Sequence, residues 1–267
     1  MTRIEIIEEK NSFPNAWARA VYRVMKIGTE ITFGGKIKDK EPPQYEKKKA
    51  KELDMTIVLE KQALREATQG ILHPQFPTKE LHKVEYLKEW DRGYDYKKQG
   101  FLYNYENRCE AYQSSYELIK MKGIAPFELP IIDQWKLAKE DLLQQIRTGI
   151  QSNRNEIVIG NPSIDRFEIP DSPPCLRSIW IRWDSKEGIE VKTEWRSRDL
   201  FTAWMVNIAG LMSAIQREII YPINQELNDF YSMVQYTDRS KSLHIYYYDW
   251  DSANLVKPIP INPQLMR

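Results

Sequence analysis

Cysteine is nearly absent from this chain: Cys109 and Cys175 are the only two among 267 residues. This excludes a disulfide-rich secreted domain, because such domains depend on several paired cysteines. The N-terminal residues carry no signal-peptide pattern. We therefore expect a reducing compartment, the cytoplasm, and two free thiols.

An excess of charge of either sign is also missing. The chain has 39 Lys and Arg residues and 38 Asp and Glu residues, which leaves a net charge of +1. Such a balance gives no overall field that would attract nucleic acid or an anionic membrane. The most apolar helical segment, residues 204–215, has about half of the ~20 residues that a bilayer requires. We expect neither a membrane nor a nucleic acid as partner, so any anion site has to be local.

Several common catalytic and ligand-binding motifs are lacking as well. The chain has no glycine-rich phosphate loop and no serine-histidine-acid arrangement, and its only histidines are His73, His82 and His244. His73 and His82 are only a weak metal signal. We expect no metal site.

The 267 residues suffice for one large domain or two small ones, and no break in composition divides them, so we expect a single domain over residues 1–267. The mixed order of the predicted helices and strands favours an α+β fold. Helical spacing predicts helices at 15–28, 133–149 and around 200–215. Strands are predicted at 55–61, 155–162 and 242–250, and a hairpin from 177–183 and 188–196. Two segments are expected to lack regular structure. They are a charged, solvated insertion at 34–54 and a proline-rich tail at 256–267.

Cys175 directly follows two prolines, in the segment "SPPCLRSIW" of residues 172–180. A lone cysteine is more often a buried hydrophobic residue than a nucleophile. A reactive thiol needs a nearby cation that lowers its pKa, and Arg196 on the second strand of the predicted hairpin is a candidate. The sequence leaves both interpretations open.

Polar residues also surround the predicted helix around 200–215. Arg196, Ser197 and Asp199 precede it, where they form either a phosphate site at the helix N-terminus or an ordinary helix cap. Asn207 lies on the apolar face of the helix, so it needs either a buried backbone partner or a polar ligand.

His244 and Tyr246 share one face of the last predicted strand. They are suited to bind sugar hydroxyls, but aromatic side chains are also common in sheet packing. From the residues alone, ligand binding and packing are both open.

Taken together, the segments "PPCLRSIW", "WRSRDLFTAWMVNIAGL" and "LHIYYYD" resemble the thymidylate synthase family in order and spacing. The resemblance covers roughly residues 100–250, and the motif sequences look closer to the divergent archaeal-type members than to the bacterial or animal enzymes. It implies an α+β fold in which a mixed sheet is packed with helices and one sheet face forms a homodimer interface.

The resemblance also implies a role for each residue of these segments. Cys175 would be the nucleophile, Arg196 and Ser197 would bind the nucleotide phosphate, and Asp199 would orient the pyrimidine or cofactor side of the pocket. Asn207 would read the base, while His244 and Tyr246 would hold the ribose.

Further segments match the family in part. "YENRCEAY" is similar to the segment of the active-site tyrosine, which points to Tyr105 before Tyr103. Arg154 matches one of two arginines that reach across the dimer to the partner's phosphate, and Asn155 stands at the second position. Lys26 and Arg23 are both candidates for an N-terminal phosphate ligand. The folate-side residues within 60–96 have no assignment.

The implied activity is transfer of a one-carbon unit to carbon 5 of dUMP through a cysteine-pyrimidine covalent intermediate. The donor would be 5,10-methylenetetrahydrofolate or methylene-tetrahydromethanopterin. Asn207 favours uracil, because family members that act on cytosine tend to carry Asp at that position. Two alternatives stay open: a dCMP, CMP or dUMP hydroxymethylase, in which water replaces hydride, and a catalytically silent relative that binds a nucleotide or RNA.

Overall fold

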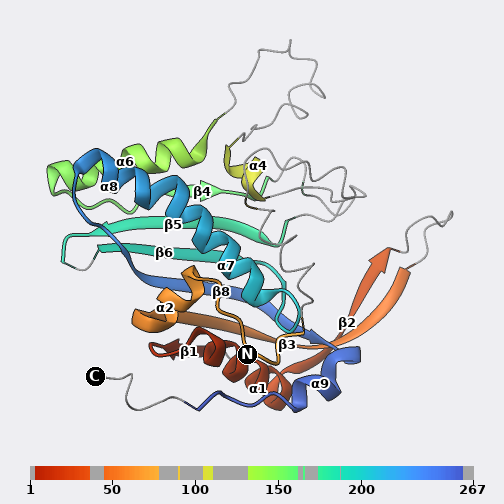
Figure 1. Ribbon diagram of the computed structural model, residues 1–267. Coiled ribbons are helices and arrows are strands. Elements are labelled where there is room, and N and C mark those ends of the chain that lie inside the picture. The colour runs from red at the N-terminus through yellow and green to blue at the C-terminus, as the bar shows by residue number, and fades with distance from the viewer. Residues whose placement is uncertain are drawn as a thin grey trace, which may run out of the picture.

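The computed structural model describes residues 4–36, 45–77, 90, 105–110, 132–161, 165, 174–186 and 188–260. Within these residues the chain is a mixed α+β fold, an open sheet of eight strands packed with helices (Figure 1). This confirms the expected fold class at the level of architecture.

The sheet is mixed, with the strand order β1-β3-β8-β6-β5-β4, and with β2 paired to β3 and β7 paired to β8. β1 is parallel to β3, and β6 and β7 are parallel to β8, whereas the other neighbours are antiparallel. The strands are β1 (Glu5–Glu9), β2 (Thr29–Lys36), β3 (Tyr45–Glu60), β4 (Glu156–Val158), β5 (Leu176–Asp184), β6 (Gly188–Trp195), β7 (Arg198–Asp199) and β8 (Met233–Tyr246).

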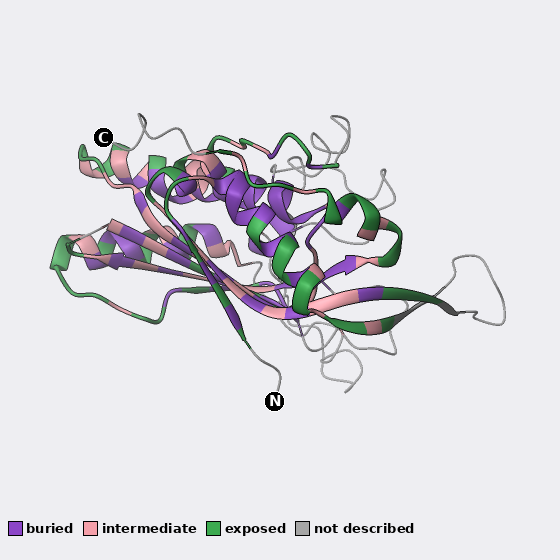
Figure 2. Cartoon of the chain, turned by 90° about the horizontal axis from the view of Figure 1, so that it is seen from below, coloured by how far each residue is buried: buried purple, intermediate pink, exposed green. Residues whose placement is uncertain are grey.

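Helices α1, α2 and α7 contact one another and lie on the same side of the sheet (Figure 1). Buried residues are concentrated where these helices meet the strands (Figure 2). The α-helices are α1 (Phe13–Ile27), α2 (Lys61–Thr68), α4 (Tyr105–Glu110), α6 (Gln134–Thr148), α7 (Trp204–Ile215), α8 (Tyr221–Leu227) and α9 (Trp250–Asn254); a π-helical turn spans Gln216–Ile220 and a 3-10 turn spans Tyr247–Asp249.

Helix ends follow local sequence signals. Ser12 caps α1 by accepting a hydrogen bond from the Asn15 backbone N–H, and Asp133 caps α6 in the same way from Lys136. Gly149 ends α6 in the left-handed conformation at φ 68°, which glycine adopts without a steric penalty. The predicted helices at 15–28 and 133–149, including the Gly149 cap, are therefore confirmed.

The segment 34–54 corrects an expectation. Its second part, from Tyr45, is strand β3 rather than a loop, and it pairs with β2 in a hairpin that extends away from the body of the molecule (Figure 1). The strand tolerates the consecutive exposed residues Lys47, Lys48 and Lys49 because solvent surrounds this hairpin and charge keeps such edges from aggregating.

The last predicted strand, 242–250, also differs from its expected bounds. β8 begins earlier, at Met233, and ends at Tyr246, where the chain turns into the 3-10 segment. The early start is explained by the ladders on both sides of β8, to β3 and to β6, which are contacts between segments far apart in the chain.

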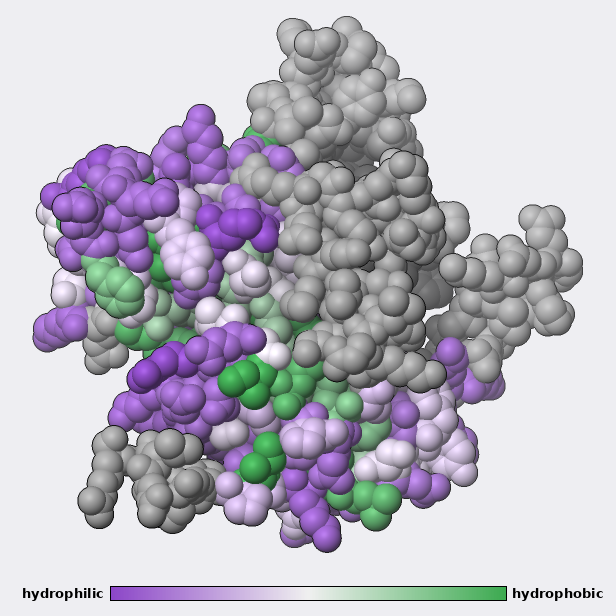
Figure 3. Space-filling model, viewed as in Figure 1, coloured by the Kyte–Doolittle hydropathy of each residue, from purple (hydrophilic) through white to green (hydrophobic). Residues whose placement is uncertain are grey.

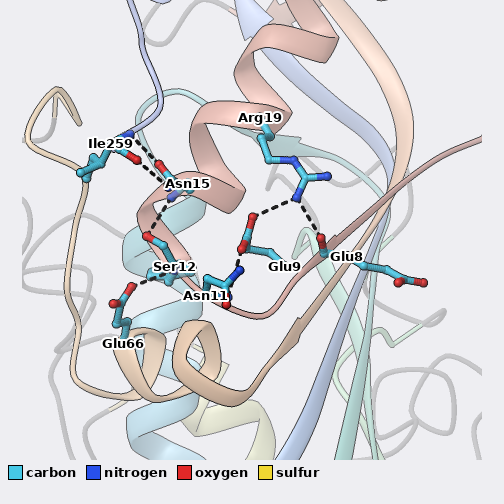
Figure 4. A network of polar contacts seen from close by, with 9 residues as sticks. Glu8, Glu9, Asn11, Ser12, Asn15, Arg19, Glu66 and Ile259 are labelled. Atoms are coloured by element: carbon cyan, nitrogen blue, oxygen red, sulfur yellow. Dashed lines mark hydrogen bonds and ion pairs between the residues drawn. The ribbon is translucent and has the colours of Figure 1, made fainter. Parts of the chain in front are cut away.

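The described part of the proline-rich tail, residues 256–260, runs without helix or strand and is held by side chains of the N-terminal third. Asn15 uses its amide twice: Nδ2 donates to the Ile259 carbonyl (3.0 Å), and Oδ1 accepts from the Ile259 N–H (2.7 Å) (Figure 4). Gln75 Oε1 accepts from the Lys257 N–H at 3.1 Å. The tail is thus fixed by hydrogen bonds to its backbone.

On the face of Figure 3, hydrophilic side chains dominate the outer surface of α6 and α8 at the upper left. An ion pair of Arg147 with Glu226 (2.6 Å) joins these two helices at the surface. Among the described residues, no helix has the length and apolar character needed to cross a membrane.

Candidate functional site

A bend at Arg196 and Ser197 separates β6 from β7. β6 pairs with β8 as far as Trp195, opposite Ser240, and β7 resumes at Arg198, opposite Leu243, without a change of register. The two strands are therefore one interrupted strand, and the two residues of the bend leave the ladder with β8. The bend places both residues at this end of the sheet, where Cys175 and His244 also lie.

Cys175 lies beside this bend, immediately before β5. The Arg196 backbone N–H donates to the Cys175 carbonyl at 2.9 Å, and Nε of Arg196 donates to the Pro174 carbonyl at 3.4 Å. The arginine is thus next to the cysteine, as the predicted hairpin requires.

The two thiols differ in their surroundings. Both are free, but Cys109 is fully buried and burial raises its pKa well above the usual value, whereas Cys175 is only half-buried against the core. Cys175 is consequently the thiol that a reagent or ligand can reach.

His244 and Tyr246 at the end of β8 face the same bend. Ser197 Oγ lies 3.5 Å from Nδ1 of His244, and the rings of His244 and Tyr246 meet edge to face with centroids 4.8 Å apart. Burial, then Asp199 and then Cys175 raise the pKa of Tyr246, which places all three groups near one another. Cys175, Ser197, His244 and Tyr246 therefore converge from three separate segments.

The environment of His244 favours the neutral form of its ring. Burial lowers its pKa, and the Asp199 carboxylate opposes this effect without overcoming it. A neutral imidazole has one ring N–H to donate and one ring nitrogen to accept, which suits recognition of a hydroxyl group.

The position of Asp199 corrects a second expectation. Its Oδ1 accepts from the backbone N–H groups of Phe201 (2.9 Å) and Thr202 (3.1 Å), and its Oδ2 accepts from the Thr202 hydroxyl. α7 begins only at Trp204. Asp199 therefore caps the turn before the helix, and Arg196 and Ser197 do not belong to the first turn of α7, because the short strand β7 comes between.

Asn207 is buried on α7 with 6% of its surface exposed, as expected from its place on the apolar face. Its backbone N–H donates to Ala203, but its side-chain amide makes no hydrogen bond within the described part of the chain. The described contacts do not join it to Cys175. Such an amide is available to a polar partner, either water or a ligand.

Tyr105 on α4 packs near the bend. Its ring stacks on Trp90 at 5.2 Å and meets Trp195, the residue before Arg196, edge to face at 5.8 Å. Tyr103, the less favoured choice, lies outside the described residues.

Other predicted site residues lie apart from this cluster. Arg154 is exposed and has no side-chain partner among the described residues, while Asn155 is buried and donates from Nδ2 to the Ala138 carbonyl. Lys26 donates to the Tyr22 hydroxyl on the exposed side of α1, and Arg23 lies 3.8 Å from Glu5. None of these four has a described contact with Cys175 or His244.

Asp249 is a member of the cluster that the sequence did not reveal. It ends the 3-10 turn after β8, and its Oδ2 is buried without a hydrogen-bond partner among the described residues. Burial and the nearby Asp199 carboxylate raise the pKa of Asp249 to about 6. The only sequence feature that could have pointed to Asp249 is its position five residues after His244. From the sequence alone, an acidic residue at that position is expected to be exposed to solvent.

The raised pKa of Asp249 predicts a loss of stability with rising pH. The unfolded chain releases this proton near pH 4 and the folded chain near pH 6, so the free energy of unfolding should fall across that window. Asp249→Asn should remove this dependence and stabilise the protein above pH 6 by about 1 kcal/mol, less than the full shift implies because solvent screens the half-exposed group. Urea unfolding at pH 4.5 and 7.5 measures the difference. The exposed Asp251→Asn is the control, and equal pH slopes for wild type and Asp249→Asn would contradict the assignment.

The cluster thus combines a reachable thiol, an adjacent guanidinium, a neutral imidazole, a phenol and two carboxylates. This set can add a sulfur nucleophile to an electrophilic ring, bind an anion and hold hydroxyl groups. Comparisons of the chain with protein-family models and with curated protein sequences gave no match.

Proposed function

We propose that this protein is a thymidylate synthase-like enzyme that transfers a one-carbon unit to carbon 5 of dUMP, with Cys175 as nucleophile. The observation that carries the proposal is the convergence of Cys175, Arg196, Ser197 and His244. They come from three segments of the chain, in the order in which the family's motifs occur. The motif resemblance and the geometry are independent lines of support.

The thiol explains the chemistry. Carbon 5 of uracil is a poor nucleophile, but addition of the Cys175 thiolate to carbon 6 converts the ring into an enolate whose carbon 5 can attack a one-carbon donor. The thiolate needs a cationic neighbour, and Arg196 is hydrogen-bonded next to it. Arg196 and Ser197 at the bend would also bind the nucleotide phosphate.

Base and sugar recognition fall to the remaining residues. The buried Asn207 amide, which lacks a described partner, would be satisfied by the adjacent N–H and carbonyl of uracil. His244 and Tyr246, in ring contact, would hold the ribose hydroxyl. Tyr105 would close the pocket from α4.

The carboxyl side of the cluster fits a reduced pterin. Asp249 has a buried oxygen without a described partner and lies near Asp199, and such oxygens accept hydrogen bonds from pterin N–H groups. The bound methylene-pterin, of folate or methanopterin type, would supply the one-carbon unit and the hydride. Asp249 and Asp199 would orient it.

A homodimer is part of the proposal. The side of the sheet away from the buried residues carries Lys192 and Glu194 of β6, both exposed. Such a face is open to a second copy of the chain. The exposed Arg154, without a described partner, would then reach the partner's nucleotide phosphate.

Release of tritium from carbon 5 tests the proposal. Wild-type protein incubated with [5-³H]dUMP and methylenetetrahydrofolate or its methanopterin counterpart should release label, with [5-³H]dCMP as the comparison substrate. Cys109→Ala, a change at the buried second thiol, is the matched control and should release label like wild type. The mass of the product separates a methyl group from a hydroxymethyl group. No release from either nucleotide with either donor would refute the transferase and favour a silent nucleotide-binding relative.

A further inference from the structure

Arg198 and Asp238 form a buried ion pair directly behind the bend. Their side chains are each 1% exposed, and Nη1 of Arg198 donates to Oδ2 of Asp238 at 2.7 Å. Asp238 also accepts from Nε1 of Trp204 (2.6 Å) and from the Ser240 hydroxyl (3.2 Å). The carboxylate is therefore held by three donors.

Arg198 itself connects three elements. Its guanidinium carbon lies 3.6 Å from the ring centroid of Trp195, the last residue of β6. Nη2 of Arg198 donates to the carbonyl of Trp204, the first residue of α7, at 3.4 Å. Asp238 belongs to β8. One side chain thus ties together the strand before the bend, the strand beside it and the helix after it.

Stability alone does not explain this arrangement. Taking two charges out of water costs more than burying apolar side chains of similar volume, so an apolar pair would hold the fold at least as well. β7, however, is only two residues long, and its ladder with β8 is too short to fix a bend by itself. The planar fork of arginine adds the fixed geometry that the ladder lacks.

The direction of neighbouring side chains follows from this anchor. Successive residues of a strand point to opposite faces, so within β7 Asp199 points away from the interior in which Arg198 is buried. Fixing Arg198 also fixes the backbone of the bend, which joins β7 directly. Arg196 and Ser197 are then held against Cys175 and His244, at the observed 3.4 Å to the Pro174 carbonyl and 3.5 Å to His244.

We propose that Arg198 is a positioning residue, whose pairing with Asp238 sets the bend so that Arg196 lies beside Cys175 and Ser197 beside His244. The proposal rests on the proposed function only in taking the bend as the nucleotide-phosphate site. The geometric effect on the Cys175 thiol is independent of any substrate.

The pH dependence of Cys175 alkylation tests the geometry. Iodoacetamide reacts with thiolate, Cys109 is fully buried, and the described groups that face Cys175 are Arg196 and Tyr246. The double variant Arg198→Met/Asp238→Leu should remain folded by circular dichroism, while the midpoint of its alkylation profile should rise by roughly 1 pH unit because Arg196 is no longer held at the thiol. Arg239→Met is the matched control and should keep the wild-type midpoint. Arg239 follows Asp238 on β8, but it is half-exposed and lies 3.8 Å from Asp54 of β3.

A second variant covers the case in which the double variant does not fold. Arg198→Lys keeps the buried charge but lacks the fork that reaches both Asp238 and the Trp204 carbonyl, and its midpoint should rise by a smaller amount. A folded variant, double or single, with the wild-type midpoint would overturn the proposal.

The KM for dUMP separates this inference from the proposed function. If wild type turns over dUMP, the KM of the double variant should rise about tenfold with a smaller change in kcat, because the phosphate ligands move. If wild type shows no turnover but the alkylation midpoint still shifts, Arg198 positions the bend and the proposed function is wrong. An unchanged KM together with an unchanged midpoint would refute the positioning role.

Discussion

Cys175→Ala should lower tritium release from [5-³H]dUMP by about 10⁴-fold or more, to the background of the assay. Without sulfur at this position no group of the cluster can add to carbon 6, and carbon 5 keeps its weak nucleophilicity. Cys175→Ser should be nearly as inactive, because a hydroxyl remains protonated at neutral pH next to Arg196. Initial rates over the first turnovers measure both variants.

Nucleotide binding should survive this change. The proposed phosphate ligands, Arg196 and Ser197, do not include the sulfur, so the Kd of Cys175→Ala for dUMP, measured by calorimetry, should stay within about threefold of wild type. Cys109→Ala is the control for loss of a thiol and should retain activity, because Cys109 is buried in the core. A Cys175→Ala variant that released label at more than a few per cent of the wild-type rate would exclude the covalent mechanism.

The parts of the fold that were predicted from sequence depend on local signals. Helices 15–28 and 133–149 were recognisable from apolar spacing, and the Gly149 cap from the glycine at the end of that spacing. The hairpin of β5 and β6 was recognisable from two β-rich segments around a turn. In each case the determining contacts join residues that are close in sequence.

The parts that were not predicted depend on distant contacts. The lysine-rich start of β3 is predicted as a loop from its sequence, and it becomes a strand through its pairing with β2. β7 is too short to leave a pattern, and it is a strand only through its pairing with Leu243 and His244 of β8, 45 positions further along the chain. The predicted helix near 200 therefore begins later than its apolar residues suggest.

The same distinction holds for the candidate site. Cys175, Arg196 and His244 could be named from motifs, and the structure brings them together. Asp249 and Arg198 could not, because a charged residue in a sequence is indistinguishable from a solvated one until its surroundings are known. Burial raises the pKa of Asp249, and it makes the ion pair of Arg198 with Asp238 inaccessible to water.

Asp238→Ala should cost about 3 to 5 kcal/mol of the free energy of unfolding. The variant leaves the Arg198 guanidinium as an uncompensated charge with 1% exposure and leaves Nε1 of Trp204 without its acceptor. Urea unfolding followed by tryptophan fluorescence measures the loss. Asp238→Asn should lose less, because its amide oxygen can still accept from Trp204.

The exposed pair of Arg147 and Glu226 is the matched control. Its nitrogen and oxygen are 2.6 Å apart, nearly the 2.7 Å of the buried pair, but its side chains are 55% and 42% exposed. Glu226→Ala should therefore cost less than about 1 kcal/mol, since water already solvates both charges. Equal losses for Asp238→Ala and Glu226→Ala would show that water reaches Arg198. The bend would then have no buried anchor, and the positioning of Arg196 beside Cys175 would need another cause.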